Sequence, residues 1–274
     1  MTPTIPSTKL NNGVKMPVVG AGMYQVPPGD TSRQVAATAL RQGYRHLDTA
    51  QAYRNEADVG RALRDSGLSR EDVFVTTKLS PRNAGFATTR ASLQESLRRL
   101  QTSYADLFLI HWPVQGLRTE SWKAMEGALS EGYCRAIGVS NYTIRHLQEL
   151  EETAEVLPAV NQVEFHPFLY QKDLLQYCQK KGIQLEAYAP LSRGEKINHP
   201  VIQRIAHETR HTPAQVMLRW ALQHELVVIP KSVHEERLME NLRSVEFRLD
   251  SVQMQALDTL PENLRTCWDP TDAP

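Results

Sequence analysis

The sequence has few cysteines and no long apolar run. Its three cysteines, Cys134, Cys178 and Cys267, lack the short spacings of zinc ligands or redox pairs. Such an odd, sparse set is typical of a reducing compartment and not of disulfide-stapled secreted domains. No segment approaches the ~18 apolar residues of a membrane helix, and "MTPTIPSTKLNNG" at the N-terminus has no signal-peptide core. These absences predict a soluble, cytoplasmic protein.

An excess of charge of either sign is also absent. Lysine and arginine together number 31, as do aspartate and glutamate. A balanced chain has no long-range attraction for nucleic acid or an anionic membrane, so we expect neither as a partner. The 274 residues can bury a sizeable core. Because no Gly- or Ser-rich linker interrupts them, we predict one domain over residues 1–274.

Eight short apolar runs alternate with helical patterns along the chain. Most runs are almost continuously apolar, as expected of parallel strands covered on both faces. This alternation favours an α/β fold with a closed (β/α)8 TIM barrel, although a doubly wound open sheet fits the same pattern. The predicted strands are residues 16–22, 44–48, 73–78, 106–112, 133–140, 159–165, 183–189 and 226–232.

Some segments extend the simple strand–helix repeat. Asn12-Gly13 in "TKLNNGVKM" is a hairpin signal and predicts an N-terminal β-hairpin that caps the barrel floor. Extra helices are expected before and after the eighth strand, one of them with Thr212 as its N-cap and Pro213 at its first position. These helices are expected over residues 199–209, 212–224, 234–244 and 250–260.

Polar side chains recur where the predicted strands end, which is where TIM barrels carry their active sites. Taken singly, each has an ordinary explanation: His111 as a core histidine, Lys78 as a rim charge, Asp48 as a helix cap. Together at one end of a barrel, they indicate an active site. The set comprises Asp48, Lys78, His111-Trp112, Ser140-Asn141, Asn161, Gln162, Glu164, Glu186, Tyr188 and Lys231-Ser232.

Six motifs resemble the aldo-keto reductase family: "GYRHLDTAQAYRNE", "TTKL", "YADLFLIHWP", "IGVSN", "NQVEFHP" and "IPKSVHEERLMEN". They follow in order and at matching separations up to about Leu260, and the short chain is most similar to the bacterial diketogluconate reductases. The resemblance implies a monomer that uses NADPH to reduce the carbonyl group of small-molecule aldehydes and ketones. A broad or a sugar-ketoacid-like substrate range is expected.

The resemblance also implies a catalytic tetrad of Asp48, Tyr53, Lys78 and His111. A carbonyl that accepts hydride develops negative charge on its oxygen, and Tyr53 would donate a proton there. The ammonium of Lys78 would lower the pKa of Tyr53, and Asp48 would pair with that buried ammonium. His111 would orient and polarise the carbonyl.

No complete Gly-rich dinucleotide loop is present, because "GAGM" lacks a third glycine. The resemblance places NADPH in the barrel mouth instead. Its nicotinamide carboxamide would meet Ser140, Asn141 and Gln162, and its ring would stack on Tyr188. Other residues expected near the cofactor are Gly22, Met23 and Asp48, together with Leu191, Ser192 and Gly194 over the pyrophosphate.

The segment "KSVHEER" is expected to bind the 2′-phosphate of NADPH. A lysine, a hydroxyl and an arginine near a helix start form a sound phosphate site on chemical grounds alone. The residues implied are Lys231, Ser232, Val233 and Arg237, with Glu240 and Asn241 at the adenine. Met23 and His234 stand where the family often has threonine.

The predicted substrate pocket comprises Tyr24, Tyr53, Ser80, His111 and Trp112, with Trp268 as a further apolar wall. Ser80 replaces a tryptophan common in relatives, so we expect a wider pocket. A second hypothesis is an NADPH-binding redox sensor or regulatory subunit with little turnover. A metal hydrolase is disfavoured because the strand ends carry no His-x-His pair, and no metal is expected.

Overall fold

The computed structural model describes residues 3–260 and 262–273. Strands β3 to β10 form one parallel sheet in which each strand pairs with the next along the chain. The sheet closes on itself, because Gly20 N donates to Val228 O at 2.9 Å and Gly22 N donates to Pro230 O at 3.1 Å. The predicted TIM barrel is confirmed, and the open-sheet alternative is wrong.

The eight barrel strands fall within or beside the predicted apolar runs. Met16 and Pro17, predicted in the first strand, pair in the N-terminal hairpin instead. The last strand is shorter than predicted, because Pro230 has no N–H to continue the ladder toward β3. The strands are β3 (Ala21–Gly22), β4 (His46–Asp48), β5 (Phe74–Leu79), β6 (Ala105–Ile110), β7 (Cys134–Ser140), β8 (Val160–Glu164), β9 (Gln184–Tyr188) and β10 (Val227–Val228).

The N-terminal hairpin closes the end of the barrel where the strands begin. Its strands β1 (Ser7–Lys9) and β2 (Lys15–Pro17) pair antiparallel around a turn with Gly13 at φ +88°, a conformation that glycine adopts without strain. Leu10 and Met16 are buried against side chains inside the barrel, among them Phe74 at the start of β5. The hairpin therefore leaves only the opposite end open to ligands.

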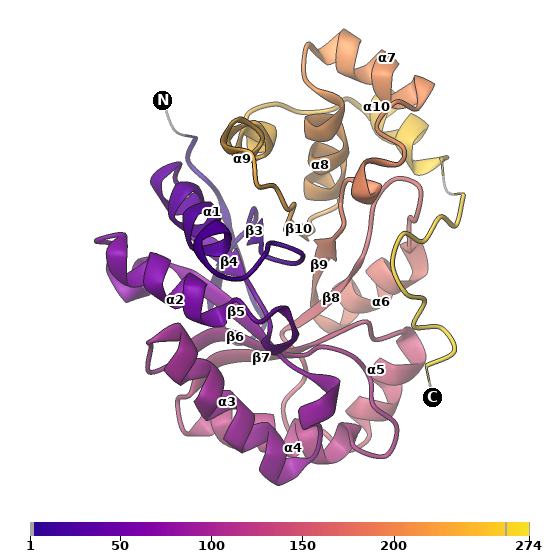
Figure 1. Ribbon diagram of the computed structural model, residues 1–274. Helices are drawn as coiled ribbons and strands as arrows, with labels where there is room; N and C mark the ends of the chain where they lie inside the picture. Colours follow the sequence, from indigo (N-terminus) through magenta and orange to yellow (C-terminus); the bar gives the residue numbers. More distant parts are fainter. Residues whose placement is uncertain (1–2, 261, 274) are drawn as a thin grey trace.

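Helices surround the barrel on its outside (Figure 1). Helices α7 and α8 before β10, and α9 and α10 after it, lie where they were predicted, so each of these two intervals has one extra helix. Thr212 caps α8 by accepting from Gln215 N. Within residues 3–260 and 262–273, none of the helices has the length and apolar character that crossing a membrane requires. The helices are α1 (Asp30–Arg41), α2 (Glu56–Asp65), α3 (Phe86–Leu100), α4 (Arg118–Ser130), α5 (Ile144–Glu151), α6 (Lys172–Lys181), α7 (Pro200–Thr209), α8 (Pro213–Gln223), α9 (Glu235–Leu242) and α10 (Ser251–Asp258).

Candidate active site

Lys78 lies at the centre of the barrel mouth and is fully buried. Its Nζ donates to Asp48 Oδ1 at 2.5 Å, to the backbone oxygen of Thr49 at 3.0 Å and to Tyr53 Oη at 3.2 Å. These bonds use all three N–H groups of the ammonium. Asp48 ends β4, and Tyr53 ends the short 3-10 helix η1 (Gln51–Tyr53) that follows. A buried ammonium is tolerated here because a carboxylate is paired with it.

His111 follows β6 and faces Tyr53, with ring centroids 5.5 Å apart and an interplanar angle of 77°. Burial, with the nearby Lys78 charge, lowers the pKa of His111 to about 3. The imidazole is therefore neutral at physiological pH. Its Nδ1 is buried without a hydrogen-bond partner among the described residues. The structure brings all four residues of the predicted tetrad together.

The pKa of Tyr53 departs from the sequence expectation. Burial, followed by the charge of Asp48, raises it well above its usual value, whereas proximity to Lys78 was expected to lower it. The Asp48 carboxylate, 2.5 Å from Lys78 Nζ, neutralises the ammonium, so the phenol meets little net positive charge. Tyr53 therefore holds its proton firmly in this site.

A second buried carboxyl group, which the sequence analysis did not assign, lies beside the tetrad. Gln162 on β8 donates from Nε2 to Asp48 Oδ2 at 2.8 Å and to Glu186 Oε2 at 2.7 Å. Burial, and then the charge of Asp48, raise the pKa of Glu186 to about 8. The polar character of Glu186 was visible in the sequence. Its place beside Gln162 follows from the register of β8 and β9, which pairs these two residues.

The residues predicted to meet nicotinamide form one hydrogen-bonded group. Tyr188 Oη donates to Asn141 Oδ1 at 2.8 Å, and Asn141 Nδ2 donates to the backbone oxygen of His111 at 3.0 Å. Ser140 Oγ donates to the backbone oxygen of Gln162 at 2.9 Å. Asn141 has φ +64°, a left-handed conformation that asparagine tolerates better than most residues. The group is thereby held rigidly next to the tetrad.

Two further predicted cofactor positions lie at the end of β3. A Cβ on Gly22 would stand 2.8 Å from the backbone oxygen of Ile229, so only glycine permits this close approach to the last strand. Met23 is fully buried in the core. Its backbone N–H donates to the backbone oxygen of Asp48 at 2.9 Å, which ties the loop after β3 to the tetrad.

The predicted pyrophosphate loop is the turn that contains η4 (Ser192–Gly194), directly after β9. Leu191 is partly buried against the core, while Ser192 is fully buried. Ser192 and Arg193 both have positive φ, 46° and 52°. Arg193 donates to Gln25 Oε1 and to the backbone oxygen of Thr266, both at 3.2 Å. This loop is therefore held to the loop after β3 and to the C-terminal segment.

The predicted phosphate site lies at the start of α9. Lys231 and Arg237 are exposed, and no ion pair engages either of them within the described residues. Ser232 Oγ accepts from His234 N at 3.0 Å, and no side chain caps the first turn of α9. Val233 is exposed nearby. Two free cations beside uncapped backbone N–H groups suit an anion.

The two predicted adenine residues differ in their surroundings. Glu240 Oε1 accepts from Thr212 Oγ1 at 2.5 Å, which links α9 to the start of α8. Asn241 is buried, with 3% of its surface exposed.

Aromatic side chains flank the mouth. Tyr24 is half exposed and its ring centroid lies 5.1 Å from that of Tyr53. Trp112 stacks on Trp268 at 5.1 Å. Ser80 Oγ accepts from Arg82 N and so caps η3 (Pro81–Asn83). Beside Ser80 and Trp112 the structure has a cavity of only about 10 Å³, room for about one water molecule.

The C-terminal segment is docked at the mouth by a buried carboxylate that the sequence analysis left without a role. Glu164 Oε1 accepts from Thr266 N at 2.7 Å and from Thr266 Oγ1 at 2.6 Å. Glu164 Oε2 accepts from Cys267 N at 3.2 Å. These bonds hold Trp268 against Trp112. No local signal announces them, because the partners lie 102 and 103 residues apart.

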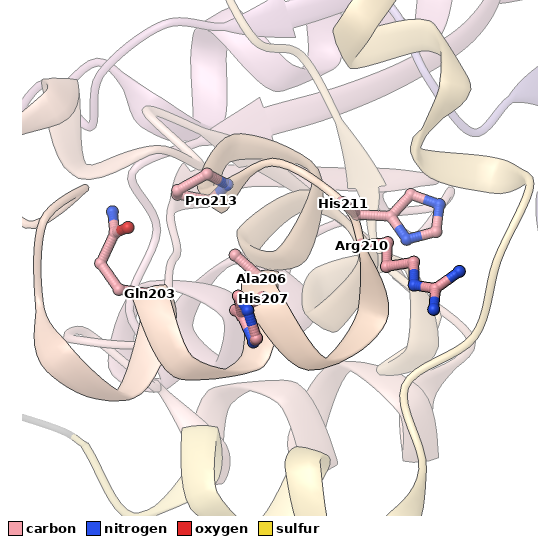
Figure 2. Close-up of a pocket in the computed structure, with 6 residues that line it drawn as sticks. All are labelled: Gln203, Ala206, His207, Arg210, His211 and Pro213. Carbon is pink, nitrogen blue, oxygen red and sulfur yellow. The ribbon is translucent and has the colours of Figure 1, made fainter.

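A larger hollow of about 540 Å³ lies away from the tetrad, on the α7–α8 pair (Figure 2). It is an open surface hollow without a buried charged side chain in its lining. Its residues are Gln203, Ala206, His207, Arg210, His211 and Pro213. None of them was predicted as a site residue, so the barrel mouth remains the candidate active site.

Comparison with known proteins gives consistent results. The model of the aldo/keto reductase family matches residues 18–195 and 198–262. The chain is 44% identical over 266 residues to a glyoxal reductase of Bacillus subtilis (strain 168), and the match covers 97% of this chain and 96% of that protein.

Solved structures agree. The crystal structure of MGS-M4, an aldo-keto reductase from a Medee basin deep-sea metagenome library, has a TM-score of 0.95 at 38% identity over 97% of this chain and 99% of that chain. A Bombyx mori aldo-keto reductase in complex with NADP has a TM-score of 0.90 at 31% identity, and the match covers 96% of this chain and 94% of that chain. Family match, sequence identity and shared fold lead to one conclusion: this chain is an oxidoreductase that belongs to the aldo/keto reductase family.

Proposed function

We propose that the protein reduces aldehydes and ketones to alcohols with NADPH, and that Tyr53 is the proton donor. The observation that carries the proposal is the position of Lys78, whose Nζ lies 2.5 Å from Asp48 Oδ1 and 3.2 Å from Tyr53 Oη. A phenol hydrogen-bonded to a buried ammonium, and open to the mouth on its other side, is suited to protonate an alkoxide as it forms.

Each residue has a distinct role. NADPH, when bound, supplies the hydride. Neutral His111 can donate an N–H to the substrate oxygen and orient it toward Tyr53. Because the pKa of Tyr53 is raised, the phenol stays protonated until negative charge develops on that oxygen. Lys78 then stabilises the phenolate that is left behind, and Asp48 keeps the ammonium in place.

The residues at the mouth fit NADPH on chemical grounds. Tyr188 presents an aromatic face and its hydroxyl is already bonded to Asn141. Lys231 and Arg237 offer unpaired positive charge at the uncapped start of α9, where a 2′-phosphate would be favoured over a 2′-hydroxyl. The NADP bound by the Bombyx mori relative supports this choice of cofactor.

Small carbonyl compounds are the proposed substrates. The similarity to a glyoxal reductase supports a short, reactive aldehyde, and sugar ketoacids remain within the proposed range. Tyr24, Trp112 and Trp268 provide apolar contact at the mouth. We further propose that the protein is cytoplasmic, since all three cysteines are free and two of them are buried. The proposal that it is a monomer rests on the family resemblance alone.

Tyr53→Phe tests the mechanism, because it removes one oxygen and keeps the ring. NADPH affinity, measured by fluorescence quenching, should remain close to wild type. Single-turnover oxidation of bound NADPH by methylglyoxal should slow by about 10²–10⁴-fold, the usual effect of losing a general acid. A variant with normal cofactor affinity and near-normal turnover would refute the assignment. Wild-type protein that binds NADPH but turns over no aldehyde would favour the redox-sensor hypothesis instead.

A further inference from the structure

The amide of Gln162 is held between two carboxyl groups from different strands. Its Nε2 donates to Asp48 Oδ2 on β4 and to Glu186 Oε2 on β9, at 2.8 Å and 2.7 Å. All three side chains are at least 98% buried. Both N–H groups of the amide are therefore occupied, and Oε1 is the atom that Gln162 has left to offer a ligand.

The surroundings of Glu186 favour its neutral form. On β10 it faces only the apolar Val227, and on β8 it faces Gln162. Across the barrel lie His46, Asp48 and Lys78, and the charge of Glu186 also acts on Tyr53. Lys78 is already paired with Asp48, so an ionised Glu186 would add an unpaired negative charge to the site.

The contacts of the two Glu186 oxygens agree with this. Oε2 accepts from Gln162, whereas Oε1 has no hydrogen-bond partner among the described residues. His46 Nε2 lies 3.7 Å from Oε1, too far for a hydrogen bond. Burial is the main reason that the pKa of His46 falls to about 3, so its ring is neutral and cannot balance a carboxylate. A proton on Glu186 leaves the cluster with one cation and one anion.

We propose that Glu186 is a positioning residue that acts through Gln162: it holds the amide so that Oε1 faces the mouth and accepts an N–H from the nicotinamide carboxamide. The inference rests on the proposed function, because it requires nicotinamide in the mouth. It has a second consequence. When Glu186 ionises at alkaline pH, the added negative charge stabilises the positively charged ring of NADP⁺ relative to NADPH.

Cofactor binding separates positioning from general stability. We would measure the dissociation constants of NADPH and of adenosine 2′,5′-bisphosphate, which lacks nicotinamide. Glu186→Ala should weaken NADPH about tenfold, the value of roughly one hydrogen bond, and leave the bisphosphate unchanged. Glu186→Gln keeps an acceptor for Gln162 and should bind NADPH nearly as wild type does. Leu185→Ala is the matched control, because it opens a cavity on the same strand without touching Gln162.

A double-mutant cycle tests whether the effect passes through Gln162. Gln162→Ala alone should weaken NADPH binding, and adding Glu186→Ala to this variant should weaken it little further. Full additivity of the two losses would overturn the proposal. So would an unchanged NADPH affinity in Glu186→Ala. If wild-type protein itself binds NADPH no more tightly than the bisphosphate, the placement of nicotinamide fails, which is a failure of the proposed function.

The pH dependence of cofactor affinity provides a readout that a purely structural role of Glu186 would not change. It can be measured even if Glu186→Ala does not fold, because it uses only wild type and Glu186→Gln. In wild type the affinity ratio of NADP⁺ to NADPH should rise between pH 7 and 9. In Glu186→Gln it should stay flat. Selective ¹³C labelling of glutamate carboxyl carbons should show one resonance in the free protein that titrates near pH 8 and is missing in Glu186→Gln. A flat ratio in wild type, or no such resonance, would overturn the proposal.

Discussion

Replacing Lys78 by methionine removes the charge at the centre of the site and keeps an unbranched side chain. The ammonium is fully buried and donates to Asp48, to the Thr49 backbone and to Tyr53. Without it, Asp48 becomes an unpaired carboxylate with 1% of its surface exposed. Breaking a buried pair by removing one partner costs about 3–5 kcal/mol, so we expect a loss of that size in the free energy of unfolding at pH 7.

The double variant Lys78→Met/Asp48→Asn separates stability from catalysis. It removes both charges. Most of the stability lost in Lys78→Met should therefore be restored, because that loss comes from the unpaired carboxylate of Asp48. Turnover should stay about 10²–10⁴-fold below wild type in both variants, since Tyr53 lacks the ammonium in each. Urea denaturation and single-turnover kinetics measure the two quantities. The reasoning is refuted if Lys78→Met lies within about 1 kcal/mol of wild type, or if the double variant is no more stable than the single.

The remaining predictions concern the cofactor, the pocket and acid stability. Arg237→Ala should weaken the binding of NADPH at least tenfold and leave the binding of NADH unchanged, since a charged hydrogen bond is worth about 1.5–3 kcal/mol. The control Arg243→Ala, at the other end of α9, should change the affinity for neither cofactor. Equal losses of affinity for both cofactors in Arg237→Ala would contradict the phosphate site. Ser80→Trp should slow bulky ketones and spare small aldehydes; a uniform loss in steady-state assays would show that Ser80 does not line the pocket. His46 and His111 have pKa values of about 3 in the folded protein against 6.5 when unfolded, so the unfolded chain binds more protons between these values and stability falls as pH drops through this window. By pH 5 the loss should be about 2 kcal/mol for each histidine, visible as a fall in Tm; an equal Tm at pH 6.5 and pH 5 would contradict it.

The sequence by itself determined the strand–helix alternation, the hairpin and the extra helices, and it proposed the four residues of the candidate tetrad. Strand and helix patterns are local, because they depend on which neighbouring side chains are apolar and on turn or cap residues such as Gly13 and Thr212. The resemblance implied these four residues because Asp48 and Tyr53 lie in one family motif, while Lys78 and His111 lie in two others that end strands.

Closure of the barrel depends on tertiary contacts that the sequence did not reveal. It requires Gly22 to leave room for the backbone of Ile229, a contact between residues far apart in the chain. The same holds for the bonds from Thr266 and Cys267 to Glu164, which dock the C-terminal segment at the mouth. Neither contact has a local sequence pattern.

The electrostatics of the site also depended on tertiary structure. The motif suggested that Lys78 lowers the pKa of Tyr53, but burial and the pairing of Lys78 with Asp48 reverse the direction. The role inferred for Glu186 arises only from strand register, which sets it beside Gln162 and within reach of the charge of Asp48. Residue identity supplies the titratable groups, whereas desolvation and neighbouring charge, which exist only in the folded chain, set their protonation.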